Sequence, residues 1–192
     1  MKTELRAVHP PRAIRWTKAL YHQMAEQGFF QNKRVELIEG EIIEMSPMGS
    51  RHWLAVNVAA DLLRRAFGES HFVTEQCPID LSALTESEPD VAVIAGKPRD
   101  YAGGLPRTAD LVVEVSDSSL DQDLGVKMRL YAAAGIPEYW VIDIVSDCLV
   151  CHRSPALADT PRYEVVASYH RGESVAPLNR PDVNITVDDL LP

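Results

Sequence analysis

Residues 111–116 read Leu-Val-Val-Glu-Val-Ser, an apolar run of strand length that one carboxylate, Glu114, interrupts. Valine-rich runs of this length indicate buried strands. A second such run, Val91–Ile94, follows directly after Pro89 and Asp90. An ionised carboxylate on a mostly apolar strand has to be paired, protonated or bound to a cation. If the two strands are neighbours in a sheet, Asp90 and Glu114 converge on one point.

Two converging carboxylates offer the hard oxygen ligands that Mg²⁺ prefers, and Mn²⁺ accepts ligands of the same kind. Such a metal polarises a phosphoryl oxygen and lowers the pKa of a bound water, which is how phosphodiesters are hydrolysed. We therefore expect Asp90 and Glu114 to be metal ligands and catalytic residues. The alternative is a strand-end turn at Asp90 and a structural salt bridge at Glu114.

A lysine follows on the next expected helix, at about residues 121–134. Lys127 and Tyr131 are one turn apart on the same face of this helix. A lysine near the metal can orient the attacking water and offset the charge that grows on the phosphate. The alternative is an ordinary surface pair of Lys127 with Asp123, worth only about 0.3–0.5 kcal/mol.

Apolar periodicity and turn residues over the rest of the chain predict the α/β class, with a central mixed sheet flanked by helices. Helices are expected over residues 18–27, 50–68 and 121–134, a hairpin over 35–45, and strands over 71–81, 90–95, 111–116, 138–144, 149–153 and 163–169. The length is that of one domain, residues 1–192, with residues 1–14 as a candidate flexible arm.

The composition, 46% hydrophobic and 24% charged, is that of an ordinary globular protein. No apolar run reaches the length of about 18 residues that a membrane helix needs, and no signal peptide is visible, so we expect a cytoplasmic protein without a membrane partner. The net charge of −9 argues against a nucleic-acid partner. Residues 1–34, however, carry a balance of +5, which could steer a polyanion or form an ordinary solvated arm.

The pair Pro89-Asp90, followed by Glu114-Val115-Ser116, resembles the Pro-Asp and Asp/Glu-x-Lys signature of the restriction-endonuclease-like nuclease superfamily. Over about residues 15–190 the chain is similar to a widespread bacterial family of restriction-endonuclease-like proteins of the Uma type. The most specific block runs from Lys127 to Trp140. The resemblance implies a central mixed sheet, dependence on Mg²⁺, cleavage of DNA, and Asp90 and Glu114 as metal ligands. It also implies a homodimer by analogy.

Further candidates come from the same resemblance. Either Glu36 or Glu41, near the N-terminal hairpin, would be an additional acidic member of the site, although hairpin glutamates commonly face solvent. His52, at the start of the second expected helix, would reach the metal or a phosphate. A histidine on an apolar stripe is otherwise a hydrogen-bonded core residue, so both interpretations of His52 stay open.

One departure from the superfamily pattern concerns the lysine slot two residues after Glu114, which Ser116 occupies. The resemblance implies that Lys127 replaces that lysine from the following helix. A protein that had lost catalysis would also lack the lysine. The alternative function is therefore a catalytically silent nucleic-acid- or protein-binding module on the same fold. A hydrolase acting on another phosphate ester is the third interpretation.

Overall fold

The computed structural model describes residues 12–192. Part of the flexible arm expected over residues 1–14 therefore lies outside the described residues. None of the helices within residues 12–192 is long and apolar enough to cross a membrane.

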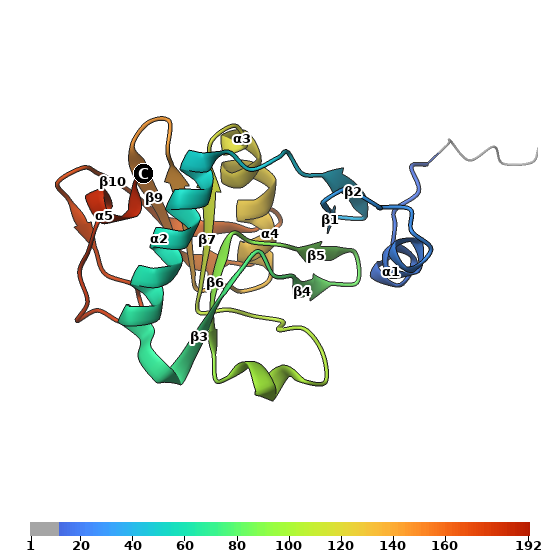
Figure 1. Cartoon of the computed structure of the whole chain (residues 1–192), viewed down its shortest axis with the longest axis horizontal. Coiled ribbons are helices and arrows are strands. Elements are labelled where there is room, and N and C mark those ends of the chain that lie inside the picture. Colours follow the sequence, from blue (N-terminus) through green and yellow to red (C-terminus); the bar gives the residue numbers. More distant parts are fainter. Residues whose placement is uncertain (1–11) are drawn as a thin grey trace, which may run out of the picture.

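The core of the molecule is a six-stranded mixed sheet, called the large sheet below (Figure 1). Its neighbouring pair β7 and β8 is parallel, and the other neighbouring pairs are antiparallel. The mixed sheet predicted from the sequence is confirmed. In spatial order the strands are β10 (Arg162–His170), β9 (Cys148–Ala156), β8 (Glu138–Asp143), β7 (Leu111–Ser116), β6 (Val91–Ala95) and β3 (His71–Glu75).

A second, four-stranded antiparallel sheet, the small sheet, lies beside the large one. Helix α1 (Lys18–Glu26) packs against it through Tyr21, which is buried with Val35 and Leu37. Thr17 caps this helix, because its hydroxyl oxygen accepts a hydrogen bond from the backbone N–H of Leu20. In spatial order the strands are β2 (Glu41–Glu44), β1 (Val35–Ile38), β5 (Thr85–Ser87) and β4 (Ile79–Ser82).

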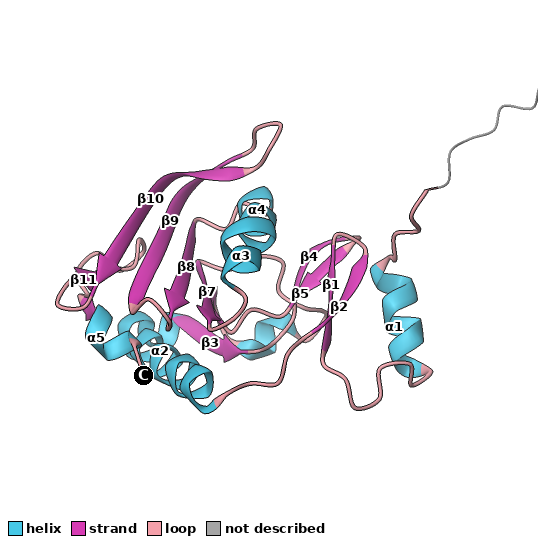
Figure 2. Ribbon diagram, turned by 90° about the horizontal axis from the view of Figure 1, so that it is seen from above, coloured by secondary structure: helices cyan, strands magenta, loops and turns pink. Residues whose placement is uncertain are grey.

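Helix α2 (Ser50–Phe67) covers one face of the large sheet (Figure 2). Apolar residues at helical spacing on α2, among them Val56 and Leu63, pack against alternate residues of the strands such as Val113 and Trp140. Strands β7 and β8 are buried over their whole length, which is why their sequences are nearly continuous apolar runs.

The opposite face of the large sheet is covered by a helical segment with three parts. These are α3 (Leu120–Gln122), the π-helical turn η3 (Asp123–Lys127) and α4 (Met128–Ala133). Tyr131 on α4 packs against Tyr139 on β8, with ring centroids 4.9 Å apart. The single regular helix expected over residues 121–134 thus contains a π-helical turn, a feature that is frequent at functional sites.

The C-terminal segment is anchored to the start of β8. Glu138 is 1% exposed and accepts hydrogen bonds from Arg153, from the indole nitrogen of Trp140 and from the backbone of Leu178. The remaining short elements are η1 (Gly68–Ser70), η2 (Pro98–Tyr101), β11 (Ser174–Val175), β12 (Ile185–Thr186) and α5 (Val187–Leu190).

The sequence-based prediction of one strand over residues 71–81 is wrong. The segment forms two strands, β3 in the large sheet and β4 in the small sheet, separated at Gln76. Gln76 has a φ of +48°, a left-handed conformation that breaks the extended chain. The chain passes between the two sheets at this residue.

Candidate active site

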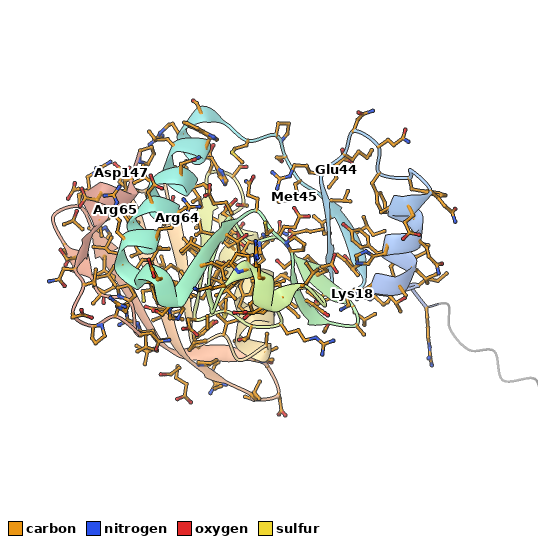
Figure 3. All side chains as sticks on the ribbon, turned by 60° about the horizontal axis from the view of Figure 1, so that its bottom comes forward. Lys18, Glu44, Met45, Arg64, Arg65 and Asp147 are labelled. Carbon is orange, nitrogen blue, oxygen red and sulfur yellow. The ribbon has the colours of Figure 1, made fainter. Side chains whose placement is uncertain are left out.

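A cleft of about 170 Å³ lies where the two sheets meet. One wall is formed by the end of β2 and the loop that follows it, where Figure 3 labels Glu44 and Met45. The other walls are formed by the N-terminal turn of α2, the ends of β3 and β7, and the π-helical turn. The sequence-predicted residues that line it are Glu36, His52, Asp90, Glu114 and Lys127.

Asp90 and Glu114 lie side by side because β6 and β7 are neighbours in the large sheet, with Val91 opposite Val113. The backbone N–H of Asp90 points to Glu114 Oε2 at 3.4 Å, and Val115 N donates to Asp90 Oδ2 at 2.9 Å. The two residues are only 6% and 3% exposed. Asp90 and Glu114 therefore converge in the structure, as their strand positions predicted.

Lys127 reaches this pair from the other side of the cleft. Its Nζ lies 3.0 Å from Glu114 Oε1 and 3.4 Å from Glu36 Oε1, and the residue is 5% exposed. Burial alone would lower the pKa of Lys127, but the neighbouring carboxylates of Glu114 and Glu36 raise it, so the amine stays charged. Lys127 is therefore not part of an ordinary surface pair with Asp123.

Asp123 is itself buried, at 2% exposed, and accepts a hydrogen bond from Ser119 Oγ at 2.6 Å. Burial raises its pKa above the usual range of aspartates. The π-helical turn spans Asp123 to Lys127 and places both side chains in the interior. Sequence reasoning missed the burial of Asp123 because it considered this residue only as the surface partner of Lys127.

Tyr131 lies one turn beyond Lys127 and is completely buried. Its hydroxyl donates to Glu114 Oε1 at 2.7 Å and lies 3.0 Å from Ser87 Oγ. Burial, together with the nearby Glu114, raises the pKa of Tyr131 well above its ordinary value, so the phenol stays a donor. Tyr131 and Lys127 thus fix the same oxygen of Glu114.

The structure separates the two glutamates of the hairpin. Glu36 is 2% exposed, and its Oε2 accepts from Ser87 Oγ and from the backbone of Glu88, both at 3.3 Å. Glu41 is exposed on the far end of the hairpin and pairs with Arg15 at 2.9 Å. Glu36 therefore joins the buried group of carboxylates, and Glu41 does not.

His52, in the first turn of α2, contacts Asp90 through Nε2 at a distance of 3.2 Å from Oδ2. Burial alone would lower the pKa of His52, but the hydrogen bond and the charge of Asp90 raise it above the ordinary value. In the same way burial would raise the pKa of Asp90, but His52 and Val115 N hold it below its usual range. The Nδ1 atom of His52 is buried without a hydrogen-bond partner in the described part of the chain.

Two further residues of the site were not found from the sequence. Ser87 bridges Glu36 and Tyr131, and Gln76 donates through Nε2 to Asp90 Oδ1 at 3.4 Å. Both lie in short polar segments without periodicity. Only tertiary pairing brings them to the cleft.

Negative charge exceeds positive charge around the cleft. Four carboxyl groups, those of Glu36, Asp90, Glu114 and Asp123, are no more than 6% exposed, and Lys127 is the one lysine or arginine among the described residues that forms an ion pair with this group. Burial raises the pKa of Glu114 to about 8, in spite of the nearby lysine. Excess buried carboxylate is relieved either by protonation or by a cation.

The carboxylate oxygens of Asp90 and Glu114 fit a hydrated divalent cation. Asp90 Oδ1 and Glu114 Oε2 accept only long hydrogen bonds of 3.4 Å, so one oxygen on each carboxylate keeps acceptor capacity toward the cleft. Residues 12–192 contain no cluster of three or more His, Cys, Asp or Glu side chains arranged to hold a metal. Mg²⁺ usually binds through one or two carboxylates and retains several waters, which matches a pair of ligands.

Most of the basic residues in the described part of the N-terminal segment, residues 12–34, are paired with carboxylates. Each of four is paired with a carboxylate: Arg15 with Glu41, Lys18 with Asp80, Lys33 with Glu44 and Arg34 with Glu88. The steering of a polyanion by this segment, one of two interpretations of the charge pattern, loses support because most of its described positive charge is locally offset.

Comparisons with known proteins agree with this architecture. The sequence model of the family Uma2, described as "Putative restriction endonuclease", matches residues 19–188. A crystal structure described as "a putative nuclease belonging to DUF820", from Anabaena variabilis, superposes with a TM-score of 0.70 and 13% sequence identity. It covers 91% of this chain and 96% of that one. At this identity the likeness shows the fold alone. No curated protein matches the chain.

Proposed function

This chain belongs to the Uma2 family, described as putative restriction endonucleases, and on that premise we propose that it is a divalent-metal-dependent nuclease that hydrolyses phosphodiester bonds of DNA. The observation that carries the proposal is the buried, net-negative group of Glu36, Asp90, Glu114 and Asp123 around one lysine in a cleft. The raised pKa of Glu114, caused by its burial in a cleft, favours a functional site over a structural ion pair.

Asp90 and Glu114 would hold the cation, Mg²⁺ or Mn²⁺. When bound, such a cation polarises a phosphoryl oxygen and lowers the pKa of a water. Glu114 keeps Oε2 directed toward Asp90, because Lys127 and Tyr131 both occupy its Oε1. The two donors therefore fix the rotation of a carboxylate that has to meet the cation in one orientation.

Lys127 would act on the substrate side of the same arrangement. Its charged amine can orient the attacking water and offset the negative charge that develops on the phosphate. The amine lies in the cleft beside Glu114, 3.0 Å from its Oε1, which is what a substitute for the strand lysine of the Asp/Glu-x-Lys pattern requires. This supports an active nuclease over a catalytically silent binding module.

The test is cleavage of supercoiled plasmid and of a single-stranded oligonucleotide with Mg²⁺, with Mn²⁺ and with chelator. We expect cleavage that needs the metal and disappears in Glu114→Gln, which keeps the size of the side chain. Lys97→Met, a change at an exposed lysine outside the cleft, should cleave like the wild type. A folded wild type that cleaves neither substrate with either metal would contradict the proposal.

A further inference from the structure

Gln76 adopts an unusual backbone conformation at the edge of the cleft. It follows the last residue of β3, and its φ of +48° lies in the left-handed region that glycine and asparagine tolerate best. Its backbone N–H points to the carbonyl oxygens of Pro89 and Asp90, at 3.1 and 3.2 Å. The segment that carries Asp90 therefore holds Gln76 in this conformation.

The side chain of Gln76 turns back to the same aspartate. Its Nε2 donates to Asp90 Oδ1 at 3.4 Å, and the residue lines the cleft. The other oxygen of Asp90, Oδ2, accepts from Val115 N and contacts His52. Among residues 12–192, Gln76 supplies the one hydrogen bond that Oδ1 accepts.

We propose that Gln76 is a positioning residue that sets the rotation of the Asp90 carboxylate in the cleft. Its left-handed backbone aims the amide at Oδ1, while Val115 N and His52 hold Oδ2. Strained backbone persists where the surrounding structure holds it and where function uses it. The inference rests on the proposed role of Asp90 as a metal ligand. Removing the hydrogen-bond partner of a ligating carboxylate typically lowers metal affinity or activity roughly 10- to 100-fold.

Two variants separate this role from a purely structural one. Gln76→Gly and Gln76→Asn both accept the left-handed backbone, but neither can donate to Asp90 Oδ1 as glutamine does, because glycine lacks the amide and the asparagine side chain is one methylene shorter. The matched control is Ser154→Gly, at an exposed residue of β9 with a φ of +59° and no part in the cleft. It relieves a similar backbone conformation away from Asp90.

The decisive measurement is hydrogen–deuterium exchange of the Val115 amide in metal-free protein, with the Val141 amide on β8 as internal reference. This amide donates directly to Asp90 Oδ2, so it reports the position of the carboxylate. In both Gln76 variants we expect exchange of the Val115 amide to become roughly tenfold faster and the Mn²⁺ dissociation constant, measured by calorimetry, to rise roughly tenfold. Both variants should melt no lower than the wild type, and Ser154→Gly should change neither readout.

Unchanged exchange at Val115 in both folded variants would overturn the positioning role, whatever the protein does with metal. The measurement also distinguishes this role from the proposed function. If the wild type bound no Mn²⁺ and cleaved no DNA, faster exchange of the Val115 amide would still support the positioning of Asp90 by Gln76.

Discussion

Lys127 Nζ and Glu114 Oε1 are 3.0 Å apart inside the protein, although Lys127 belongs to the π-helical turn and Glu114 to a central strand. The strand position from which a lysine could reach the same place, two residues beyond Glu114, holds Ser116. In the proposed function the helix therefore supplies the amine that the strand lacks.

Replacing Lys127 by methionine removes the charge and keeps most of the volume. We expect plasmid cleavage to fall roughly 100- to 1,000-fold, as for other groups that stabilise developing charge. The free energy of unfolding in urea should fall by about 3 kcal/mol, because two buried carboxylates lose their partner. Lys97→Met is the control. Cleavage by Lys127→Met within twofold of the wild type would exclude a catalytic role for Lys127.

A lysine at position 116 should partly replace Lys127. Residues 114 and 116 point to the same face of β7, and the hydroxyl of Ser116 is buried without a hydrogen-bond partner in the described part of the chain. In the double variant Ser116→Lys/Lys127→Ala we expect cleavage to recover roughly tenfold over Lys127→Ala alone, because the amine is restored. Equal activity of the double and single variants, both folded by circular dichroism, would show that the helix position is required.

The hydroxyl of Tyr131 should matter more than its ring. Tyr131→Phe keeps the packing against Tyr139 but removes one of the two donors to Glu114 Oε1. The free energy of unfolding should decrease by about 1–3 kcal/mol, because a buried acceptor loses a partner. Cleavage should fall roughly tenfold. The matched control is Tyr163→Phe, which removes a buried hydroxyl that donates to the backbone of Ile136 and should leave cleavage unchanged.

Mg²⁺ should stabilise the folded protein in the absence of any substrate. At a concentration ten times the dissociation constant, a ligand that binds only the folded state adds about 1.4 kcal/mol. For a chain of this size that corresponds to a rise in melting temperature of roughly 3–6 °C. Glu114→Gln should abolish the rise, measured by differential scanning calorimetry with and without chelator. An equal rise in that variant would place the cation elsewhere.

His152 should make the protein less stable in mild acid. It is buried between Tyr139 and Tyr163, and burial lowers its pKa in the folded state. Below the ordinary histidine pKa of about 6.5 the unfolded state therefore binds a proton that the folded state does not, so stability is lost as pH falls.

The matching variant is His152→Phe, compared with the wild type by urea unfolding at pH 7.5 and pH 5.5. The wild type should lose up to about 1.4 kcal/mol per pH unit more than the variant below pH 6.5. Equal losses in both proteins would show that the buried imidazole does not cause the acid sensitivity.

The fold was predictable where local pattern and tertiary environment agree. The apolar runs of β7 and β8 and the periodic face of α2 identified the elements, and the neighbouring strands brought Asp90 to Glu114. The break at Gln76 could not be predicted, because nothing in its side chain requires a left-handed backbone. It results from hydrogen bonds to Pro89 and Asp90, which are distant in sequence.

The geometry of the candidate site was predictable for the pair Asp90 and Glu114 and less so for the residues around it. Glu36 lies on a hairpin, where a glutamate usually faces solvent, and it is buried because β1 is an interior strand of the small sheet between β2 and β5. Asp123 was considered only as the surface partner of Lys127, and both side chains are buried because this helical segment packs against the large sheet. In both cases the cause is a tertiary arrangement that composition and periodicity do not encode.

The chain crosses between the two sheets three times, after β2, at Gln76 and before Asp90, and each crossing lines the cleft. The small sheet is consequently formed by two separate parts of the chain, residues 35–44 and 79–87. Helix α2 and strand β3 of the large sheet lie between these parts in the sequence. The segments that form the two walls of the cleft alternate along the chain. A single genetic crossover therefore cannot replace one wall by that of a relative without also replacing part of the other wall. The two walls of the cleft therefore cannot be exchanged as separate modules, and changes to its lining are best made as single substitutions within the cleft.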